Sequence, residues 1–179
     1  MKTTKTAIQK EPPKKETNVE RLKGTRVYLR RYGIVSESSE LYEAVNVLNT
    51  PELVRPALNK LMRLDTYGCE LFIVLSLDTK LRMTAASVIT QGTLDASIVH
   101  PREVFQAAIM NNAASIIVVH NHPSGDPTPS KKDTAVTRQL IKAGRLLSIP
   151  VKDHIILGEE KLLSPGFHSM RGSGEIAFD

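Results

Sequence analysis

Apolar residues of this chain gather in short runs that have the length of a β-strand. Residues 69–77 and 81–91 are two such runs, and the turn-forming segment 78–80 between them predicts a β-hairpin. Residues 114–119 read Ala-Ser-Ile-Ile-Val-Val, a β-branched run typical of a buried strand. Residues 149–157 are the last clear run of this kind. The pattern therefore predicts four strands.

Elsewhere the apolar residues recur at helical spacing. Residues 41–48 predict one helix, and residues 51–62 predict another, with Thr50 as N-cap and a proline at the first helical position. Two further helices are predicted over residues 101–111 and 131–147. The side chains expected to face the core are Val104, Phe105, Ala108 and Ile109 in the first of these, and Ala135, Val136, Leu140 and Leu147 in the second.

Two histidines follow the strand predicted over residues 114–119. Side chains alternate between the faces of a strand, so His120 and His122 point the same way and Asn121 points away. Two imidazoles on one side of a strand end can bind one zinc ion, each at about 2.0–2.1 Å. We therefore expect a zinc site here.

The segment after the histidines supplies the third ligand. Residues 123–129 hold three prolines and a glycine, which predicts a bent loop, and a helix then begins with Ser130 as N-cap and Asp133 in its first turn. Asp133 can turn back toward the histidines. Two histidines and one carboxylate leave a position for water, which is the pattern of a catalytic zinc, and the hydroxyl of Ser130 beside that water could stabilise an oxyanion.

Each of these residues also has a plainer explanation. Ser130 and Asp133 have the spacing of a capping box with Asp in place of Glu, and a histidine beside a proline-rich turn is commonly a loop residue. The combined spacing of His-x-His, seven residues, Ser, two residues and Asp is specific, and it favours the metal site.

That spacing matches the JAMM motif of the MPN (JAB) metalloprotease-like domains. The surrounding segments resemble the RadC family: GTLDASIVHPREVF at 92–105, HNHPSG at 120–125 and DHII at 153–156. The resemblance covers roughly residues 38–175. It implies the α/β MPN fold, with a mixed central sheet flanked by helices, and zinc held by His120, His122 and Asp133. It also implies hydrolysis of peptide or isopeptide bonds in a peptide or protein substrate.

Hydrolysis needs a base, and the spacing alone leaves Glu70 and Glu103 as alternatives. The resemblance favours Glu70, because the MPN glutamate lies on an early strand in a Glu-x-Phe context that Glu70-Leu-Phe72 fits. Glu103 is explained by its place in the first turn of a helix. His154 could orient a zinc ligand, but we favour a histidine satisfied within the core.

Charge separates the chain into two parts. Residues 1–31 carry ten Lys and Arg against three Glu, a net +7, while the remainder carries fourteen against sixteen, a net −2. We predict a basic, disordered tail over residues 1–35 and one RadC-like domain over residues 36–179. A single cysteine excludes a disulfide framework, and the absence of a long apolar run or signal core predicts a cytoplasmic protein outside the membrane.

Two other functions are alternatives to a hydrolase. A non-catalytic module for DNA repair or recombination, binding DNA or a protein partner, is suggested by the family's DNA-repair naming and by the basic tail. A nuclease is suggested by the letters His120-Asn-His122, but sites of that name spread these residues over separate elements, so we reject it.

Overall fold

The computed structural model describes residues 47–62, 68–92, 99–160 and 166–178. The predicted tail and most of the predicted helix over 41–48 lie outside these residues. Within them, no helix is both long enough and apolar enough to cross a bilayer.

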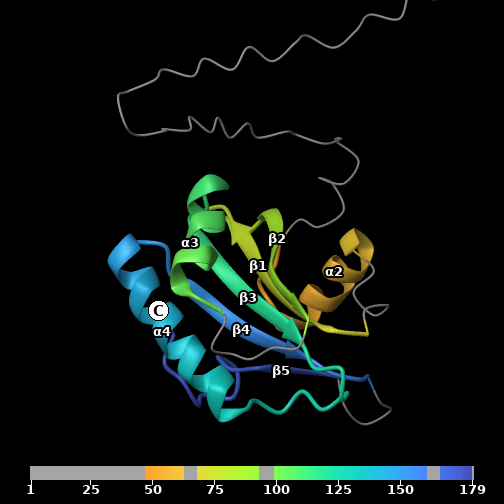
Figure 1. Cartoon of the computed structure of the whole chain (residues 1–179). Coiled ribbons are helices and arrows are strands. Elements are labelled where there is room, and N and C mark those ends of the chain that lie inside the picture. The colour runs from red at the N-terminus through yellow and green to blue at the C-terminus, as the bar shows by residue number, and fades with distance from the viewer. Residues whose placement is uncertain (1–46, 63–67, 93–98, 161–165, 179) are drawn as a thin grey trace, which may run out of the picture. The chain divides into compact units, whose positions relative to one another are not determined.

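Five strands of the described residues form one mixed sheet (Figure 1). They are β1 (Glu70–Leu77), β2 (Met83–Gly92), β3 (Ser115–Asn121), β4 (Val151–Leu157) and β5 (Phe167–Ser169), in the order β2-β1-β3-β4-β5. β3 and β4 are parallel, and the other neighbours are antiparallel. The predicted hairpin, β1 followed by β2, is confirmed.

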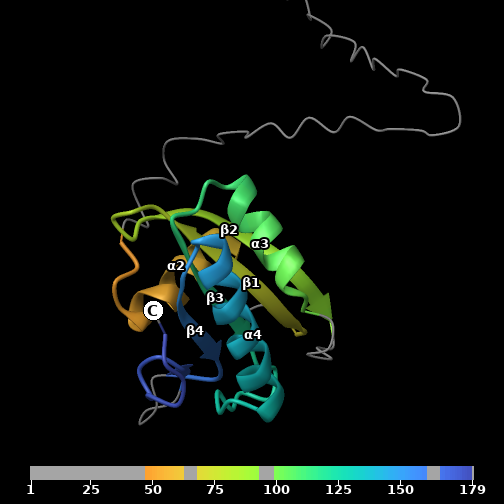
Figure 2. The same cartoon turned by 90° about the vertical axis from the view of Figure 1, so that its left-hand side faces the viewer.

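Helices cover both faces of this sheet (Figures 1 and 2). A 3-10 turn η1 (Pro51–Leu53) leads into α2 (Val54–Met62) on one face, while α3 (Pro101–Met110) and α4 (Lys131–Leu147) lie on the other. α4 connects the parallel strands β3 and β4, as a parallel pair requires. The predicted α/β fold, a mixed sheet flanked by helices, is confirmed.

Two hydrophobic clusters lie on the two faces, and the alternation of β1 divides its side chains between them. Phe72 and Val74 join the cluster under α3 and α4, which includes Phe105 and Leu140. The alternate residues of β1 join the cluster under α2: Leu71, Ile73, Leu75 and Leu77. Because both faces are covered, β1 is apolar along nearly its whole length.

Some predicted details are wrong. Ala135 is exposed, as are Ile109 and Leu147, at 54% and 46%; the last two lie in the final turns of their helices. The core side of α4 is instead completed by Thr137, Ile141 and Gly144. The strand β5 was not predicted, because three residues are too few to show an alternation.

Gly144 is required where α4 passes close to the chain that follows it. A Cβ at this position would lie 2.6 Å from the carbonyl oxygen of Ile149 and 3.2 Å from Cζ of Phe105. Glycine to alanine in a helix usually stabilises by about 1 kcal/mol. Here we expect Gly144→Ala to lower the free energy of unfolding of chelator-treated protein by about 1–3 kcal/mol, measured by urea denaturation.

Gly68→Ala is the matched control, since no heavy atom lies within 4 Å of the added Cβ there. It should leave the urea midpoint nearly unchanged. A Gly144→Ala protein as stable as the wild type would contradict the close approach of α4 to Ile149.

Candidate metal centre

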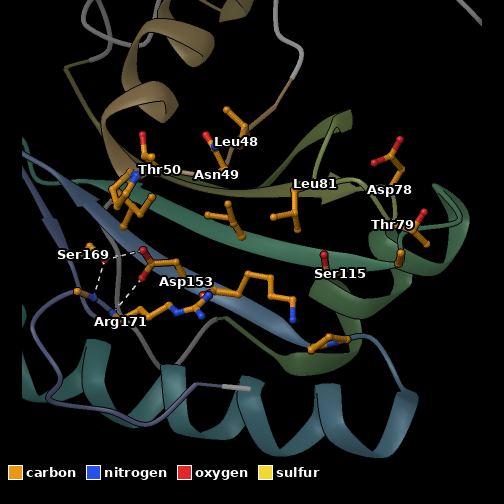
Figure 3. A pocket seen from close by; sticks show the side chains of 17 residues that line it. Leu48, Asn49, Thr50, Asp78, Thr79, Leu81, Ser115, Asp153, Ser169 and Arg171 are labelled. Carbon is orange, nitrogen blue, oxygen red and sulfur yellow. Dashed lines mark hydrogen bonds between the residues drawn. The ribbon is translucent and has the colours of Figure 1, made fainter.

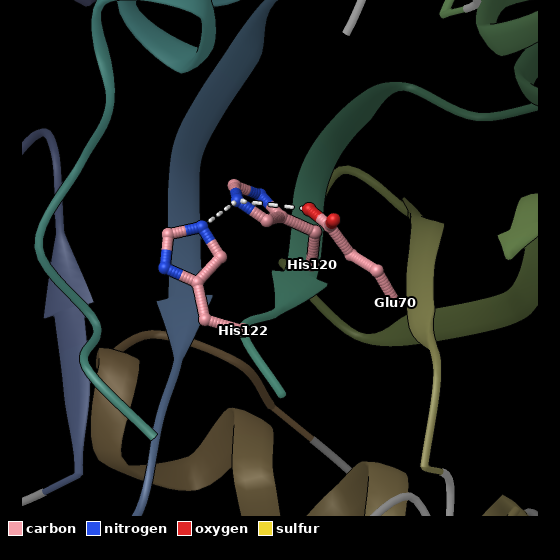
Figure 4. Close-up of side chains that lie close together, drawn as sticks. All are labelled: Glu70, His120 and His122. Carbon is pink, nitrogen blue, oxygen red and sulfur yellow. Dashed lines mark hydrogen bonds and ion pairs between the residues drawn. The ribbon is translucent and has the colours of Figure 1, made fainter. Parts of the chain in front are cut away.

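The strand β3 carries both predicted histidines at its end. His120 is buried and His122 is 18% exposed, and their Nε2 atoms lie 3.0 Å apart (Figure 4). The ring of Phe72 stacks on His120 with an interplanar angle of 13°. Asn121 points elsewhere: its side chain accepts from the N–H of Leu71 and donates to the carbonyl of Cys69. The predicted alternation along this strand is confirmed.

The register of β1 against β3 brings Glu70 to the histidines. Phe72 pairs with His120 in this antiparallel ladder, so Glu70, two residues earlier, lies on the same face near His122. Its Oε1 is 3.9 Å from Nε2 of His120. Three side chains each bring one possible ligand atom to this place, and these atoms lie within 4.8 Å of one another: Glu70, His120 and His122 (Figure 4). They could therefore hold a metal ion.

The first turn of α4 adds a second carboxylate. Oδ1 of Asp133 is 3.5 Å from Nε2 of His120, and Oδ2 is 3.8 Å from Nε2 of His122. The same side chain completes a capping box with Ser130, whose Oγ accepts from the N–H of Asp133 while Oδ2 accepts from the N–H of Ser130. The plain explanation of these two residues is therefore correct, and the carboxylate of Asp133 still lies beside the histidines.

The hydrogen bond behind His122 decides which of its nitrogens carries the proton. Nδ1 lies 2.7 Å from the carbonyl oxygen of Asp126, and a carbonyl can only accept. Nδ1 of neutral His122 is therefore the donor, and Nε2 presents a lone pair toward His120. The carboxylates of Glu70 and Asp133 also offer lone pairs. These lone pairs converge on one place, an arrangement that a bound cation would stabilise.

Burial keeps the two inner histidines neutral. The pKa of His120 is lowered to about 4, mainly by burial and partly by His122, while Asp133 opposes the shift. The pKa of His154 is lowered well below its usual value by burial and then by His120. His154 is fully buried, as predicted, but its Nε2 also lies 2.7 Å from Nδ1 of His120. The contact between His154 and His120 results from the parallel pairing of β3 with β4, which the spacing of residues in the sequence does not predict.

Other candidate residues lie away from these side chains. Glu103 is in the first turn of α3 and pairs with Arg102 at 3.6 Å, with both side chains exposed. His100 is the exposed N-cap of the same helix. Of the two glutamates considered as base, the structure places Glu70 beside the histidines.

Two cavities lie on the described part of the chain, and one of them borders the two histidines. One is lined by His122, Asn121, Arg55 and Glu159, and therefore borders the site directly. The other is lined by Ile117 and Ile155 of the cluster under α2, and opens on the face of the sheet away from His120 (Figure 3). In that second cavity Asp153 accepts hydrogen bonds from Ser169 Oγ and from the N–H of Arg171.

A mixed sheet between helices, with a His-x-His strand end and two carboxylates beside it, is consistent with an α/β protein of the JAB/MPN type. The model of the RadC-like JAB domain matches residues 48–172, and the chain belongs to this family.

Relatives of the chain share about half of the aligned residues. A UPF0758 protein of Methanosarcina barkeri is 54% identical over 95 residues, which are 53% of this chain and 42% of that protein. A UPF0758 protein of Desulforamulus reducens is 54% identical over 107 residues, 60% of this chain and 45% of the relative. One of Thermotoga maritima is 47% identical over 107 residues, 60% and 46% of the two chains. The chain thus matches less than half the length of these relatives.

The lowered pKa of His120 predicts how stability depends on pH. In metal-free protein, the unfolded state takes up a proton on this imidazole near pH 6.5, whereas the folded state does so only near pH 4. The unfolded state therefore binds more protons within this window, and His120 by itself should lower the free energy of unfolding by about 3 kcal/mol as the pH drops from about 6.5 to about 4, with His154 adding a decrease of the same sign. Urea denaturation at a series of pH values measures this.

Two variants separate His120 from other titrating groups. His120→Gln should remove the part of the decrease that His120 contributes and leave the part that comes from His154, while His100→Gln, at an exposed position, should keep the whole decrease. If His120→Gln followed the wild-type pH dependence, burial of a neutral imidazole at this position would be refuted.

Proposed function

We propose that this chain is a zinc-dependent hydrolase of peptide or isopeptide bonds. The observation that carries the proposal is the approach of His120 Nε2 and His122 Nε2 to 3.0 Å, with Asp133 and Glu70 oxygens within 4 Å of His120. Nδ1 of His122 donates to the carbonyl of Asp126, so Nε2 of the neutral ring offers a lone pair. Such a set of lone pairs is stabilised by a cation.

Three of these residues would hold the metal and the fourth would act on protons. His120, His122 and Asp133 supply two nitrogens and one oxygen, a ligand set that zinc accepts in catalytic sites. When bound, zinc polarises a carbonyl and lowers the pKa of a water molecule to about 7. The capping box restrains Asp133, since the N–H of Ser130 donates to Oδ2.

Glu70 has the position and exposure of a general base. Its side chain is 19% exposed, so a proton can reach it from solvent or substrate, and its Oε1 lies 3.9 Å from His120 Nε2. We infer that Glu70 takes a proton from the attacking water and passes it to the leaving amine, as acyl transfer requires.

Ser130 would stabilise the negative charge that develops on the carbonyl oxygen. Its Oγ accepts from the N–H of Asp133, which leaves the hydroxyl proton available to donate. The residue is exposed at the start of α4, where a substrate can approach it.

The substrate is expected to enter through the cavity that His122 lines. This cavity is open and is bordered by the chain at Gly158 and Glu159, which fits a peptide or the tail of a protein. DNA contact through residues 1–31, and with it a role in DNA repair, stays a prediction from the basic tail and the family's DNA-repair naming.

Replacing Glu70 tests whether this residue acts as the base while His120, His122 and Asp133 bind the metal. Glu70→Gln keeps the shape of the side chain but removes the base, so hydrolysis should fall by roughly 10²–10⁴-fold while bound zinc is retained. Rates are measured on internally quenched peptides and isopeptide-linked substrates, with metal content determined on the same samples.

Glu103→Gln is the control, since that carboxylate lies on α3 away from the histidines, and its activity should equal that of the wild type. Loss of zinc in Glu70→Gln would mean that Glu70 is a ligand and not the base. Absence of any hydrolysis that depends on Glu70 in zinc-loaded protein would refute the proposed activity.

A further inference from the structure

A chain of buried polar groups connects His120 to the backbone of Asp133. Nδ1 of His120 lies 2.7 Å from Nε2 of His154, and Nδ1 of His154 lies 2.6 Å from Oγ1 of Thr137. Oγ1 of Thr137 lies in turn 2.6 Å from the carbonyl oxygen of Asp133. His154 and Thr137 are both fully buried, so water does not compete for these hydrogen bonds.

The carbonyl at one end of this chain sets the direction of every hydrogen bond in it. Oγ1 of Thr137 has two neighbours that can only accept, the carbonyl of Asp133 and, at 3.4 Å, the sulfur of Met170. Two oxygens 2.6 Å apart need a proton between them, so the single hydroxyl proton is donated to the carbonyl of Asp133, and toward His154 the hydroxyl must accept. Nδ1 of His154 consequently carries the proton.

The direction of these hydrogen bonds also determines which nitrogen of His120 donates. His154 is fully buried, where an unpaired charge is costly, so a ring that donates from Nδ1 presents a lone pair at Nε2 and accepts there from Nδ1 of His120. Across this 2.7 Å contact Nδ1 of His120 is therefore the donor, and a neutral ring carries its one proton there. Its Nε2 is left with a lone pair directed at His122, Asp133 and the expected metal.

We propose that His154 and Thr137 are positioning residues that fix the Nδ1–H tautomer of His120 and so prepare its Nε2 as a metal ligand. This inference rests on the metal site of the proposed function. It assigns a role to two buried residues of β4 and α4 that lie outside the His-x-His, Ser and Asp pattern. Since the chain begins at the backbone of Asp133, one proposed ligand helps to orient another.

The tautomer can be observed without any metal. In metal-free protein labelled with ¹⁵N-histidine, at a pH above 7, long-range ¹H–¹⁵N correlation spectra distinguish the protonated ring nitrogen from the bare one. We expect His120 and His154 each to carry the proton on Nδ1. A proton on Nε2 of His120 would overturn the proposal, and this result does not depend on whether the protein hydrolyses anything.

Metal affinity gives a second test. If Thr137 only supported the packing of α4, removing its hydroxyl would leave the affinity for Zn²⁺ unchanged. Thr137→Val keeps the shape but removes the hydroxyl, so His154 loses its fixed tautomer and the affinity for Zn²⁺ should fall by roughly 10–100-fold. Thr137→Ser restores the hydroxyl and should bind Zn²⁺ nearly as tightly as the wild type. Competition with a chromophoric chelator measures both affinities.

A stability control separates lost affinity from lost packing. Leu140→Val removes buried volume from the same helix without touching the hydrogen-bonded chain, and it should retain Zn²⁺ affinity. Equal affinity in Thr137→Val and Thr137→Ser would overturn the proposal. If wild-type protein with the expected tautomer failed to bind Zn²⁺, the hydrolase would be refuted while the tautomer assignment would stand.

Discussion

The hydrogen-bond acceptors behind the two histidines are the constraint on which the site depends. An imidazole that donates from Nδ1 to a fixed acceptor must present a lone pair at Nε2 while it is neutral. His122 donates to the carbonyl of Asp126, and His120 donates into a buried chain that ends at the carbonyl of Asp133. The fold thereby directs two lone pairs at each other over 3.0 Å, an arrangement that favours a cation between carboxylates.

The elements that carry these groups are held by ordinary structural interactions. The capping box that starts α4 also directs the carboxylate of Asp133 toward the histidines. The side chain of Asn121 bonds the backbone of Cys69 and Leu71, the residues on either side of Glu70, and so ties the start of β1 to the end of β3. Stability and function therefore share the same contacts in this region, and substitutions there are expected to affect both.

The parts of the site that could be predicted from sequence are those set by local geometry. Alternation along one strand placed His120 and His122 on one face, and helix-capping chemistry placed Asp133 in the first turn of α4. The position of Glu70 beside the histidines depends on the antiparallel register between β1 and β3, which are about fifty residues apart in the sequence. Only the family resemblance favoured Glu70 over Glu103. His154 contacts His120 because β4 pairs in parallel with β3, and α4 lies between these two strands in the sequence. The periodicity of the sequence does not show which side chain a buried histidine contacts. Most of the fold was predictable because its strands and helices are long and regular, while β5 was too short to be recognised.

Metal content shows most directly whether His120, His122 and Asp133 form a zinc site. Protein purified without added metal and then equilibrated with Zn²⁺ should retain about one zinc ion per chain after desalting, by elemental analysis. His122→Ala and Asp133→Ala should each lose it, because each removes a ligand from the convergent set, while remaining folded by circular dichroism. A well-folded wild-type protein that retains no zinc, or His122→Ala and Asp133→Ala variants that retain as much as the wild type, would contradict the account.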